Sequence, residues 1–368
     1  MADPRMVKLA EVMVNYSLNV QPGEWVSIRG DYLVAAPFFQ ELYRQIILAG
    51  GHPTPFLYSN AFQEIKLKNA TSEQLEWIAP TAKLRVEHVS ADIFIFANEN
   101  TRMLTNVDNN KQAALQTALR DLNATITERA AEGSMRWAIA PYPCQAFAQD
   151  ANMSLSEYED FVYKATFADQ DDPVKQWQQV HDKQAKLVDW LAGKKELRIQ
   201  SPSCDVSLSI EGRKFINADG HVNMPDGEIF TGPVEDSAEG WVNFTYPAIR
   251  LGREVEGIRL EFKKGKVVKA SAQKNEEFLL AQIDIDEGAR RVGELGIGTN
   301  FGITQFTKSM LFDEKIGGTF HMALGKSYPQ TGGVNKSAIH WDMLCDIRTS
   351  SQITVDGQLF YQDGEFKI

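Results

Sequence analysis

Residues 311–342 read LFDEKIGGTFHMALGKSYPQTGGVNKSAIHWD, and two short runs alternate strictly: TFHMAL inside this stretch and AIHWDM, which ends one residue beyond it at Met343. A β-strand sends successive side chains to opposite faces, so each run is expected to form a strand with one apolar face. The apolar faces consist of Phe320, Met322 and Leu324 in the first run and of Ile339, Trp341 and Met343 in the second. The opposite faces carry His321 in the first run and His340 with Asp342 in the second. The stretch therefore predicts two packed strands that project two imidazoles and a carboxylate.

Two glycine-flanked glutamates precede that stretch, in the segments NMPDGEIF and GELGIGTN. The Pro-Asp-Gly turn in the first segment is expected to place Glu228 at the start of a strand. Glycines around Glu294 allow the backbone to come close to whatever the carboxylate holds. Each residue is a weak signal alone, because a glutamate after a turn is usually solvated and a strand histidine is usually a hydrogen-bonded core residue. The His-x-Asp spacing favours a metal more strongly, although the helical metalloprotease pattern H-E-x-x-H is absent.

Length and composition restrict the class of protein. A chain of 368 residues exceeds what one hydrophobic core usually serves, so two domains are expected. The net charge of −11 argues against a nucleic-acid partner and suits metal cations or substrates that carry an ammonium group. The three cysteines lack C-x-x-C spacing, so we expect free thiols and no thiolate zinc site. No apolar run is long enough for a membrane span, and the first residues are typical of an amphipathic helix, which predicts a cytoplasmic protein.

Residues 1–193 alternate short apolar runs with longer helical patterns, which predicts an α/β domain with a mostly parallel sheet. Strands are expected at residues 25–29, 55–58, 92–97 and 136–140, and helices at 37–48 and 110–131 with two more between 154 and 193. After the first strand, Gly30 is a single glycine where the dinucleotide-binding fingerprint needs three. A nucleotide site in this domain therefore rests on analogy of fold alone.

Residues 194–368 consist of short alternating segments with glycine-rich turns, which predicts a β-rich, barrel-like α+β domain that carries the metal site. Among its strands we expect residues 197–199, 206–210, 258–262 and 267–270, and we expect one helix at roughly residues 275–295.

Four separated segments, NMPDGEIFTGP, GELGIGTN, LFDEKIGGTFHMALGKSYP and SAIHWD, resemble in this order the signature segments of the thermophilic-type metal-dependent aminopeptidases. The resemblance covers the whole chain and is densest over residues 223–342. It implies two metal ions per chain. The ligands that it implies are Glu228, Glu294, His321, His340 and Asp342. It also implies a homodimer.

Three carboxylates and two imidazoles without a thiolate suit Zn²⁺, Co²⁺ or Mn²⁺. Five side chains serve two ions only if a carboxylate is shared, and we nominate Glu228 for that position. Tyr328 matches a tyrosine that the family places beside the metals, where its hydroxyl can donate to a tetrahedral oxyanion; the alternative is a tyrosine that packs on a turn. Glu314 is a candidate general base or amine-binding group, although a triplet such as Asp313-Glu314-Lys315 is usually a solvated loop.

The resulting hypothesis is a cytoplasmic aminopeptidase that acts on peptides with a free N-terminus through a water activated by two metals. It needs neither nucleic acid nor a membrane as a partner. One alternative is a metal-dependent hydrolase of another amide, or of a blocked peptide that is cut in its interior. A second alternative, from another class, is a nucleotide-binding protein based on the N-terminal domain. A catalytically silent binding protein is disfavoured because all five expected ligands are present.

Overall fold

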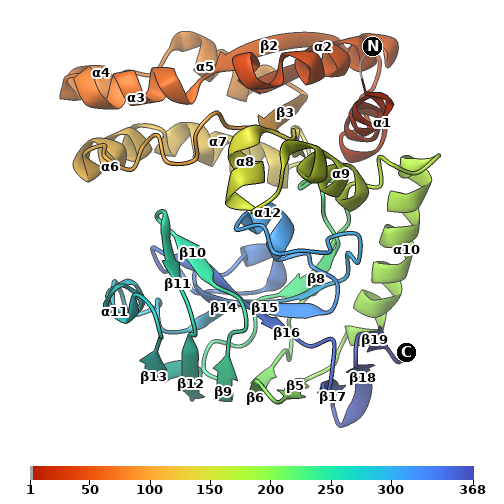
Figure 1. Cartoon of the computed structure of the whole chain (residues 1–368), viewed down its shortest axis with the longest axis vertical. Helices are drawn as coiled ribbons and strands as arrows, with labels where there is room; N and C mark the ends of the chain where they lie inside the picture. The colour runs from red at the N-terminus through yellow and green to blue at the C-terminus, as the bar shows by residue number, and fades with distance from the viewer. Residues whose placement is uncertain (1–2) are drawn as a thin grey trace. The chain divides into compact units, whose positions relative to one another are not determined.

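The structure of the protein is a computed structural model that describes residues 3–368. Its chain forms two compact units (Figure 1). Unit 1 comprises Met1–Gln176 and Gly220–Pro225, and unit 2 comprises Trp177–Asp219 and Asp226–Ile368. The domain boundary at 193/194 that the composition suggests stays a prediction.

A four-stranded parallel sheet forms the centre of unit 1, in the order β2-β1-β3-β4. Its strands are β1 (Trp25–Asp31), β2 (His52–Tyr58), β3 (Ala91–Phe96) and β4 (Arg136–Pro141). Parallel neighbours need long crossover connections, and helices supply them here. The inner strands β1 and β3 bury Ile28 and Ile93 completely, as expected for a sheet that is covered on both faces. The predicted α/β organisation of this half of the chain is confirmed.

Helices connect these strands and continue the chain beyond them. They are α1 (Pro4–Val12), η1 (Met13–Ser17), α2 (Tyr32–Leu48), α3 (Asn60–Asn69), α4 (Ser72–Glu76), α5 (Pro80–His88), α6 (Asn109–Ala118), α7 (Arg120–Ala131), α8 (Gln145–Asp150), α9 (Leu155–Ala165) and α10 (Pro173–Leu191), which continues into unit 2. Helix α2 begins earlier than predicted because Asp31 caps it, and its regular part follows a kink at Ala35. The single helix expected at 110–131 is two helices that meet at Leu119, and no residue type there marks the break.

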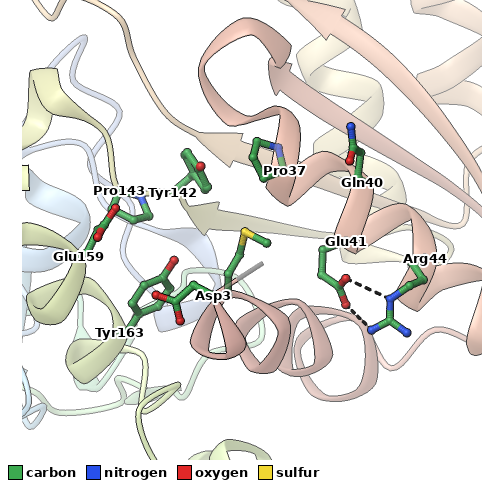
Figure 2. Close-up of a pocket in the computed structure, with 10 residues that line it drawn as sticks. Asp3, Pro37, Gln40, Glu41, Arg44, Tyr142, Pro143, Glu159 and Tyr163 are labelled. Carbon is green, nitrogen blue, oxygen red and sulfur yellow. Dashed lines mark hydrogen bonds and ion pairs between the residues drawn. The ribbon is translucent and has the colours of Figure 1, made fainter. Parts of the chain in front are cut away.

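Unit 1 contains a pocket of about 620 Å³ between α1, α2, the end of β4 and α9 (Figure 2). Its lining includes the carboxylates of Asp3, Glu41 and Glu159; Arg44 lies 2.5 Å from Glu41, and Arg5 lies 2.8 Å from Asp3, which leaves more carboxylates than guanidinium groups. An excess of carboxylates repels phosphate groups. This pocket therefore gives no support to the nucleotide-binding alternative.

Unit 2 is β-rich, as the sequence predicts, and the strands of its sheets pair antiparallel. An eight-stranded sheet has the order β13-β12-β9-β6-β5-β17-β18-β19, and a five-stranded sheet has the order β16-β15-β14-β8-β7. The first sheet consists of β5 (Glu196–Ser201), β6 (Cys204–Ser209), β9 (Glu239–Asn243), β12 (Arg259–Lys263), β13 (Lys266–Ser271), β17 (Gln352–Val355), β18 (Gln358–Gln362) and β19 (Glu365–Phe366). The second consists of β7 (Ile216–Ala218), β8 (Glu228–Thr231), β14 (Val292–Gly298), β15 (Thr319–Gly325) and β16 (His340–Asp346). A separate hairpin joins β10 (Ala248–Arg250) to β11 (Arg253–Val255), and one hydrophobic core contains side chains of both large sheets.

The helix expected at residues 275–295 is wrong over its second half. Helix α11 covers only Glu276–Ile283, and residues 292–298 form β14. Residues 286–291 contain Glu, Ala and Arg, which favour helices. In the segment that follows, however, Glu294, Gly296 and Gly298 alternate with the buried apolar residues Leu295 and Ile297, as in a strand. Pairing with β8 and β15 on both sides decides its structure. Two short helices, α12 (Met310–Asp313) and η2 (Pro329–Thr331), complete the unit.

Within residues 3–368, no helix combines the length and the apolar composition that a membrane crossing requires.

Candidate metal centre

The five predicted ligands lie on one face of the five-stranded sheet. Strand pairing sets Gly298 opposite Glu228, Gly296 opposite His321, and Ala323 opposite Asp342. The other face joins the hydrophobic core. Its side chains include Ile229, Leu295, Ile297, Phe320, Met322, Leu324, Trp341 and Met343. The alternation that the sequence predicts is therefore confirmed, and it separates a polar face from an apolar one across four strands.

Glu294 occupies the middle of the polar face. Its Oε1 lies 3.2 Å from Nε2 of His321, and its Oε2 lies 3.4 Å from Nε2 of His340. Glu228 approaches the first imidazole, with Oε2 at 3.4 Å from Nε2. Asp342 approaches the second, with Oδ1 at 3.5 Å from Nε2 of His340. The strands thus bring all five side chains together, although they come from positions up to 114 residues apart in the sequence, at Glu228 and Asp342.

The donor set of this face fits divalent cations. Ligand atoms of Glu228, Glu294 and His321 lie within 4.8 Å of one another, and so do those of Glu294, His340 and Asp342. Among the described residues, buried oxygens of all three carboxylates, Oε2 of Glu228, Oε2 of Glu294 and Oδ1 of Asp342, have no hydrogen-bond donor. A buried carboxylate oxygen without a donor is costly unless a cation approaches it. The arrangement therefore supplies oxygen and nitrogen ligands, and a bound cation would satisfy the carboxylate oxygens that have no hydrogen-bond donor.

Two backbone contacts orient the imidazoles. Nδ1 of His340 donates to the carbonyl oxygen of Lys326 at 2.8 Å, which leaves Nε2 to face the carboxylates. His321 lies against the backbone of Gly296. A Cβ atom built at Gly296 would lie 2.1 Å from Cε1 of His321 and 2.3 Å from its Nε2. Glycine is therefore required at this position for the imidazole to keep its place.

The carboxylates also control the protonation of the centre. Burial alone would lower the pKa of both imidazoles, but the neighbouring carboxylates raise the pKa of His321 to about 9 and that of His340 to about 10. Burial raises the pKa of Glu294 as well. The metal-free centre therefore holds protons near neutral pH, and a metal must displace them to bind.

The Asp313-Glu314-Lys315 turn is not the solvated loop that its composition suggests. The carboxylate of Asp313 is buried and accepts hydrogen bonds from both N and Oγ1 of Thr307, at 2.7 and 2.8 Å. Lys315 is only 1% exposed, and its Nζ lies 2.6 Å from Oε1 of Glu228 and 2.5 Å from Oε1 of Glu314. Sequence reasoning missed Lys315, because its burial depends on contacts with residues far away in the chain.

Lys315 also lies 3.9 Å from Oδ1 of Asp226. Burial opposes the charge of this lysine, but the surrounding carboxylates raise its pKa well above the ordinary value. The ammonium group is therefore a fixed positive charge at the edge of the centre. The carboxylate of Glu314 belongs to the same neighbourhood, since its ligand atom lies within 4.8 Å of those of His321 and Asp342.

Tyr328 lies beside the centre and precedes η2. Its ring meets the imidazole of His340 edge to face, with 5.1 Å between the centroids, and meets Phe230 at 5.7 Å. The side chain keeps 39% exposure, so the phenol contacts both the centre and solvent. Partial burial and the carboxylates of Glu294 and Asp342 raise the pKa of the phenol. The hydroxyl therefore stays protonated and can donate a hydrogen bond.

Residues 2–366 match the protein family described as "Thermophilic metalloprotease (M29)". The chain belongs to this family. The family resemblance and the enzyme class that the sequence predicts, a metal-dependent hydrolase of peptide bonds, are therefore confirmed. The signature segments that suggested the family, from NMPDGEIFTGP to SAIHWD, all lie within the matched residues of this M29 metalloprotease.

Curated relatives match nearly the whole M29 chain. "Aminopeptidase 2" of Geobacillus stearothermophilus is 27% identical over 396 residues, which cover 95% of this chain and 93% of the relative. "Aminopeptidase T" of Thermus thermophilus is 26% identical over 399 residues, which cover 97% and 95%.

Solved structures support the fold. Wild-type AmpT from Thermus thermophilus superimposes with a TM-score of 0.84 at 23% identity and covers 99% of both chains. A 2,5-dihydroxypyridine dioxygenase from Pseudomonas putida KT2440 has a TM-score of 0.58 at 14% identity, over 100% of this chain and 98% of its own. At these identities the likeness shows the fold alone. The dioxygenase illustrates that one fold can serve different reactions, so the function must be argued from the site.

Proposed function

We propose that this M29 metalloprotease is an aminopeptidase that releases N-terminal residues from peptides at a centre of two divalent ions. The proposed ligands are Glu228, Glu294, His321, His340 and Asp342. The observation that carries the proposal is that the two oxygens of Glu294 face the Nε2 atoms of two different imidazoles, and that a further carboxylate, of Glu228 or of Asp342, approaches each of these Nε2 atoms. Curated relatives named as aminopeptidases support the choice of an exopeptidase.

The geometry favours Glu294 as the shared carboxylate in place of Glu228, which the sequence argument nominated. The two oxygens of Glu294 face different histidines. Glu228 faces only His321, because its other oxygen is bonded to Lys315. Two of the three candidate ligand groups contain Glu294, which supports a division of the centre into two neighbouring sites.

Charge supports the number of ions. Asp226, Glu228, Glu294, Glu314 and Asp342 are five carboxylates, and Lys315 is the ammonium group among them. With neutral imidazoles, these six groups carry a formal charge of −4, which two divalent ions neutralise. Nitrogen and oxygen ligands without a thiolate suit Zn²⁺, Co²⁺ or Mn²⁺.

Divalent ions at this centre would polarise the scissile carbonyl group and lower the pKa of a water molecule. The chain's own residues provide the remaining functions. The hydroxyl of Tyr328 stays protonated and donates a hydrogen bond to the oxyanion that develops from the carbonyl oxygen. Glu314 provides a carboxylate that can accept a proton or bind the α-ammonium group of the substrate. His340, oriented by the carbonyl group of Lys326, keeps Nε2 directed at the centre.

Two assays test this function. Chelation should abolish the hydrolysis of aminoacyl chromogenic substrates, and added Zn²⁺ or Co²⁺ should restore it. A peptide with a free N-terminus should be cleaved, whereas its acetylated counterpart should not. Activity that is indifferent to chelation contradicts the role of metals, and equal cleavage of both peptides contradicts the exopeptidase.

A homodimer and a cytoplasmic location complete the proposal. The first rests on the family resemblance, and its test is the molar mass of the purified protein by light scattering. Twice the chain mass of 41.3 kDa is expected.

A further inference from the structure

Lys315 is held rigidly at the edge of the proposed centre. Its backbone N–H donates to the carbonyl oxygen of Phe312 at 3.0 Å, and its own carbonyl oxygen accepts from the N–H of Asn300 at 3.0 Å. Asp313, two residues before it, is fixed by Thr307 through two hydrogen bonds. The fold therefore fixes the backbone position from which the buried side chain of Lys315 reaches the carboxylates.

The ammonium group of Lys315 forms a hydrogen bond with only one of the two oxygens of Glu228. Oε1 accepts a hydrogen bond from Nζ at 2.6 Å. Oε2 has no hydrogen-bond partner among residues 3–368 and lies 3.4 Å from Nε2 of His321. A carboxylate can bind a metal through one oxygen or through both. While Oε1 stays on Lys315, only Oε2 faces the position between Glu228 and the imidazole.

The same ammonium group holds Glu314. This residue caps the end of α12 and lies outside the sheet, so strand pairing does not fix its side chain. Its Oε1 lies 2.5 Å from Nζ of Lys315. An ammonium group has three hydrogens and can donate to both glutamates at once. Lys315 thereby links a residue of the proposed metal shell to the candidate base or amine-binding group.

We propose that Lys315 is a positioning residue, whose ammonium group restricts Glu228 to one metal-facing oxygen and holds the Glu314 carboxylate beside the centre. The inference rests on the proposed function, since both effects matter only when ions bind. It assigns no proton transfer to the lysine. Its consequence is that the ammonium group, rather than a ligand, sets the coordination number at the site next to Glu228.

The variant Lys315→Met tests this role, because methionine has similar length and no charge. Lys308→Met is the matched control: Lys308 also binds a glutamate, Oε2 of Glu254 at 3.0 Å, but lies outside the centre. Metal-free wild type and both variants are titrated with Co²⁺, and their visible absorption is recorded. We expect weaker absorption from the Lys315 variant, since Glu228 can then bind with both oxygens and a higher coordination number weakens cobalt bands. The control should keep the spectrum of the wild type.

Steady-state kinetics provide a second measurement on the same proteins. The Lys315 variant should lose ~10- to 100-fold in kcat/KM for a dipeptide with a free N-terminus, the worth of one charge-assisted hydrogen bond. The control should be unchanged. A Lys315 variant with the spectrum and kcat/KM of the wild type overturns the inference and leaves the proposed function intact. A wild type that binds no cobalt contradicts the proposed function itself.

Removing a buried charge can prevent folding. For that case, a crystal structure of the zinc-loaded wild type decides. The inference predicts that Glu228 binds zinc through Oε2 alone while Oε1 remains on Lys315. Binding of zinc through both oxygens of Glu228 overturns it.

Discussion

The two units each bury a cluster of charged side chains, and the clusters differ in balance. In unit 1, the carboxylate of Asp92 accepts hydrogen bonds from Nη2 of Arg29 at 2.5 Å, from Nη1 of Arg85 at 3.0 Å and from the hydroxyl of Ser27. There, two guanidinium groups are bonded to one carboxylate. In unit 2, the centre contains five carboxylates, three of which are proposed ligands, and a single ammonium group, that of Lys315, which contacts Asp226, Glu228 and Glu314.

This difference distinguishes a structural cluster from the proposed functional one. The Asp92 cluster is complete without any further partner, and it joins strands to a neighbouring helix. Among the described residues, the proposed metal centre keeps buried oxygens without hydrogen-bond donors, and its five carboxylates outnumber its cationic groups. A fold tolerates such a deficit where an external cation supplies the missing charge. Removing a carboxylate should therefore have opposite effects on the stability of the two metal-free clusters.

Glu294→Gln should have the largest effect on function. It removes the carboxylate that both proposed sites share, so metal affinity should fall by more than the ~10- to 100-fold typical of outer-shell partners, and activity should be abolished. In chelator, however, the variant should be at least as stable as the wild type, because the five carboxylates of the centre outnumber its cationic groups even when both imidazoles are protonated. Isothermal titration with Zn²⁺ and calorimetry in chelator measure the two effects. Full metal affinity, or a clear loss of metal-free stability, would break the comparison.

Asp92→Asn should destabilise the protein by about 3–5 kcal/mol, because it leaves two buried or half-buried guanidinium groups without their carboxylate. Burial raises the pKa of Asp92, but Arg29 and Arg85 outweigh it and lower the pKa overall. Its contribution to stability is therefore present above the ordinary aspartate pKa and is lost as the pH falls through the lower, folded-state value. Urea unfolding at pH 7 and at acidic pH measures both effects. The number of bound metal ions should not change.

Gly296→Ala tests the position of the His321 imidazole without substituting a proposed ligand. The added methyl group would overlap His321, so the imidazole must move away from Glu294 and Glu228. We expect metal affinity to fall by about 10- to 100-fold, as for loss of a supporting contact. Gly333→Ala is a glycine control in the same unit, since its Cβ would meet Ser327 and not a ligand. Equal metal affinity in Gly296→Ala and the wild type would contradict the described packing.

The smallest effect concerns pH. Metals bind neutral imidazole, and the metal-free centre raises the pKa of His321 to about 9 and that of His340 to about 10. Binding should therefore release protons at pH 7, and affinity should rise with pH by up to about tenfold per unit for each imidazole that loses a proton. Titrations in buffers of different ionisation enthalpy count the released protons. Affinity that is constant between pH 6.5 and 8 would show that the imidazoles are already neutral.

The polar face of the centre could be predicted from local signals. The period of two in TFHMAL and AIHWDM identified β15, β16 and their buried faces, because alternation is a property of a single strand. The Pro-Asp-Gly turn likewise placed Glu228 at the first residue of β8. These signals need no knowledge of the partner strands.

The remaining features depend on contacts between distant segments. The helix predicted through residues 284–295 followed local propensity, whereas pairing with β8 and β15 made residues 292–298 a strand. The contact between Oε1 of Glu228 and Lys315 depends on how the segment after α12 packs against the sheet. The composition of the triplet Asp313-Glu314-Lys315 does not reveal this packing. For the same reason the sequence could not show that Glu294 lies between both histidines. The strand order, which places β14 next to β15 and β15 next to β16, decides that point.

The most direct test of the central claim is anomalous diffraction from crystals of the zinc-loaded protein, with data on both sides of the zinc absorption edge. The account predicts two neighbouring zinc peaks that share Glu294. One should be bordered by Glu228 and His321, and the other by His340 and Asp342. A single peak, or zinc bound away from these five residues, would contradict it.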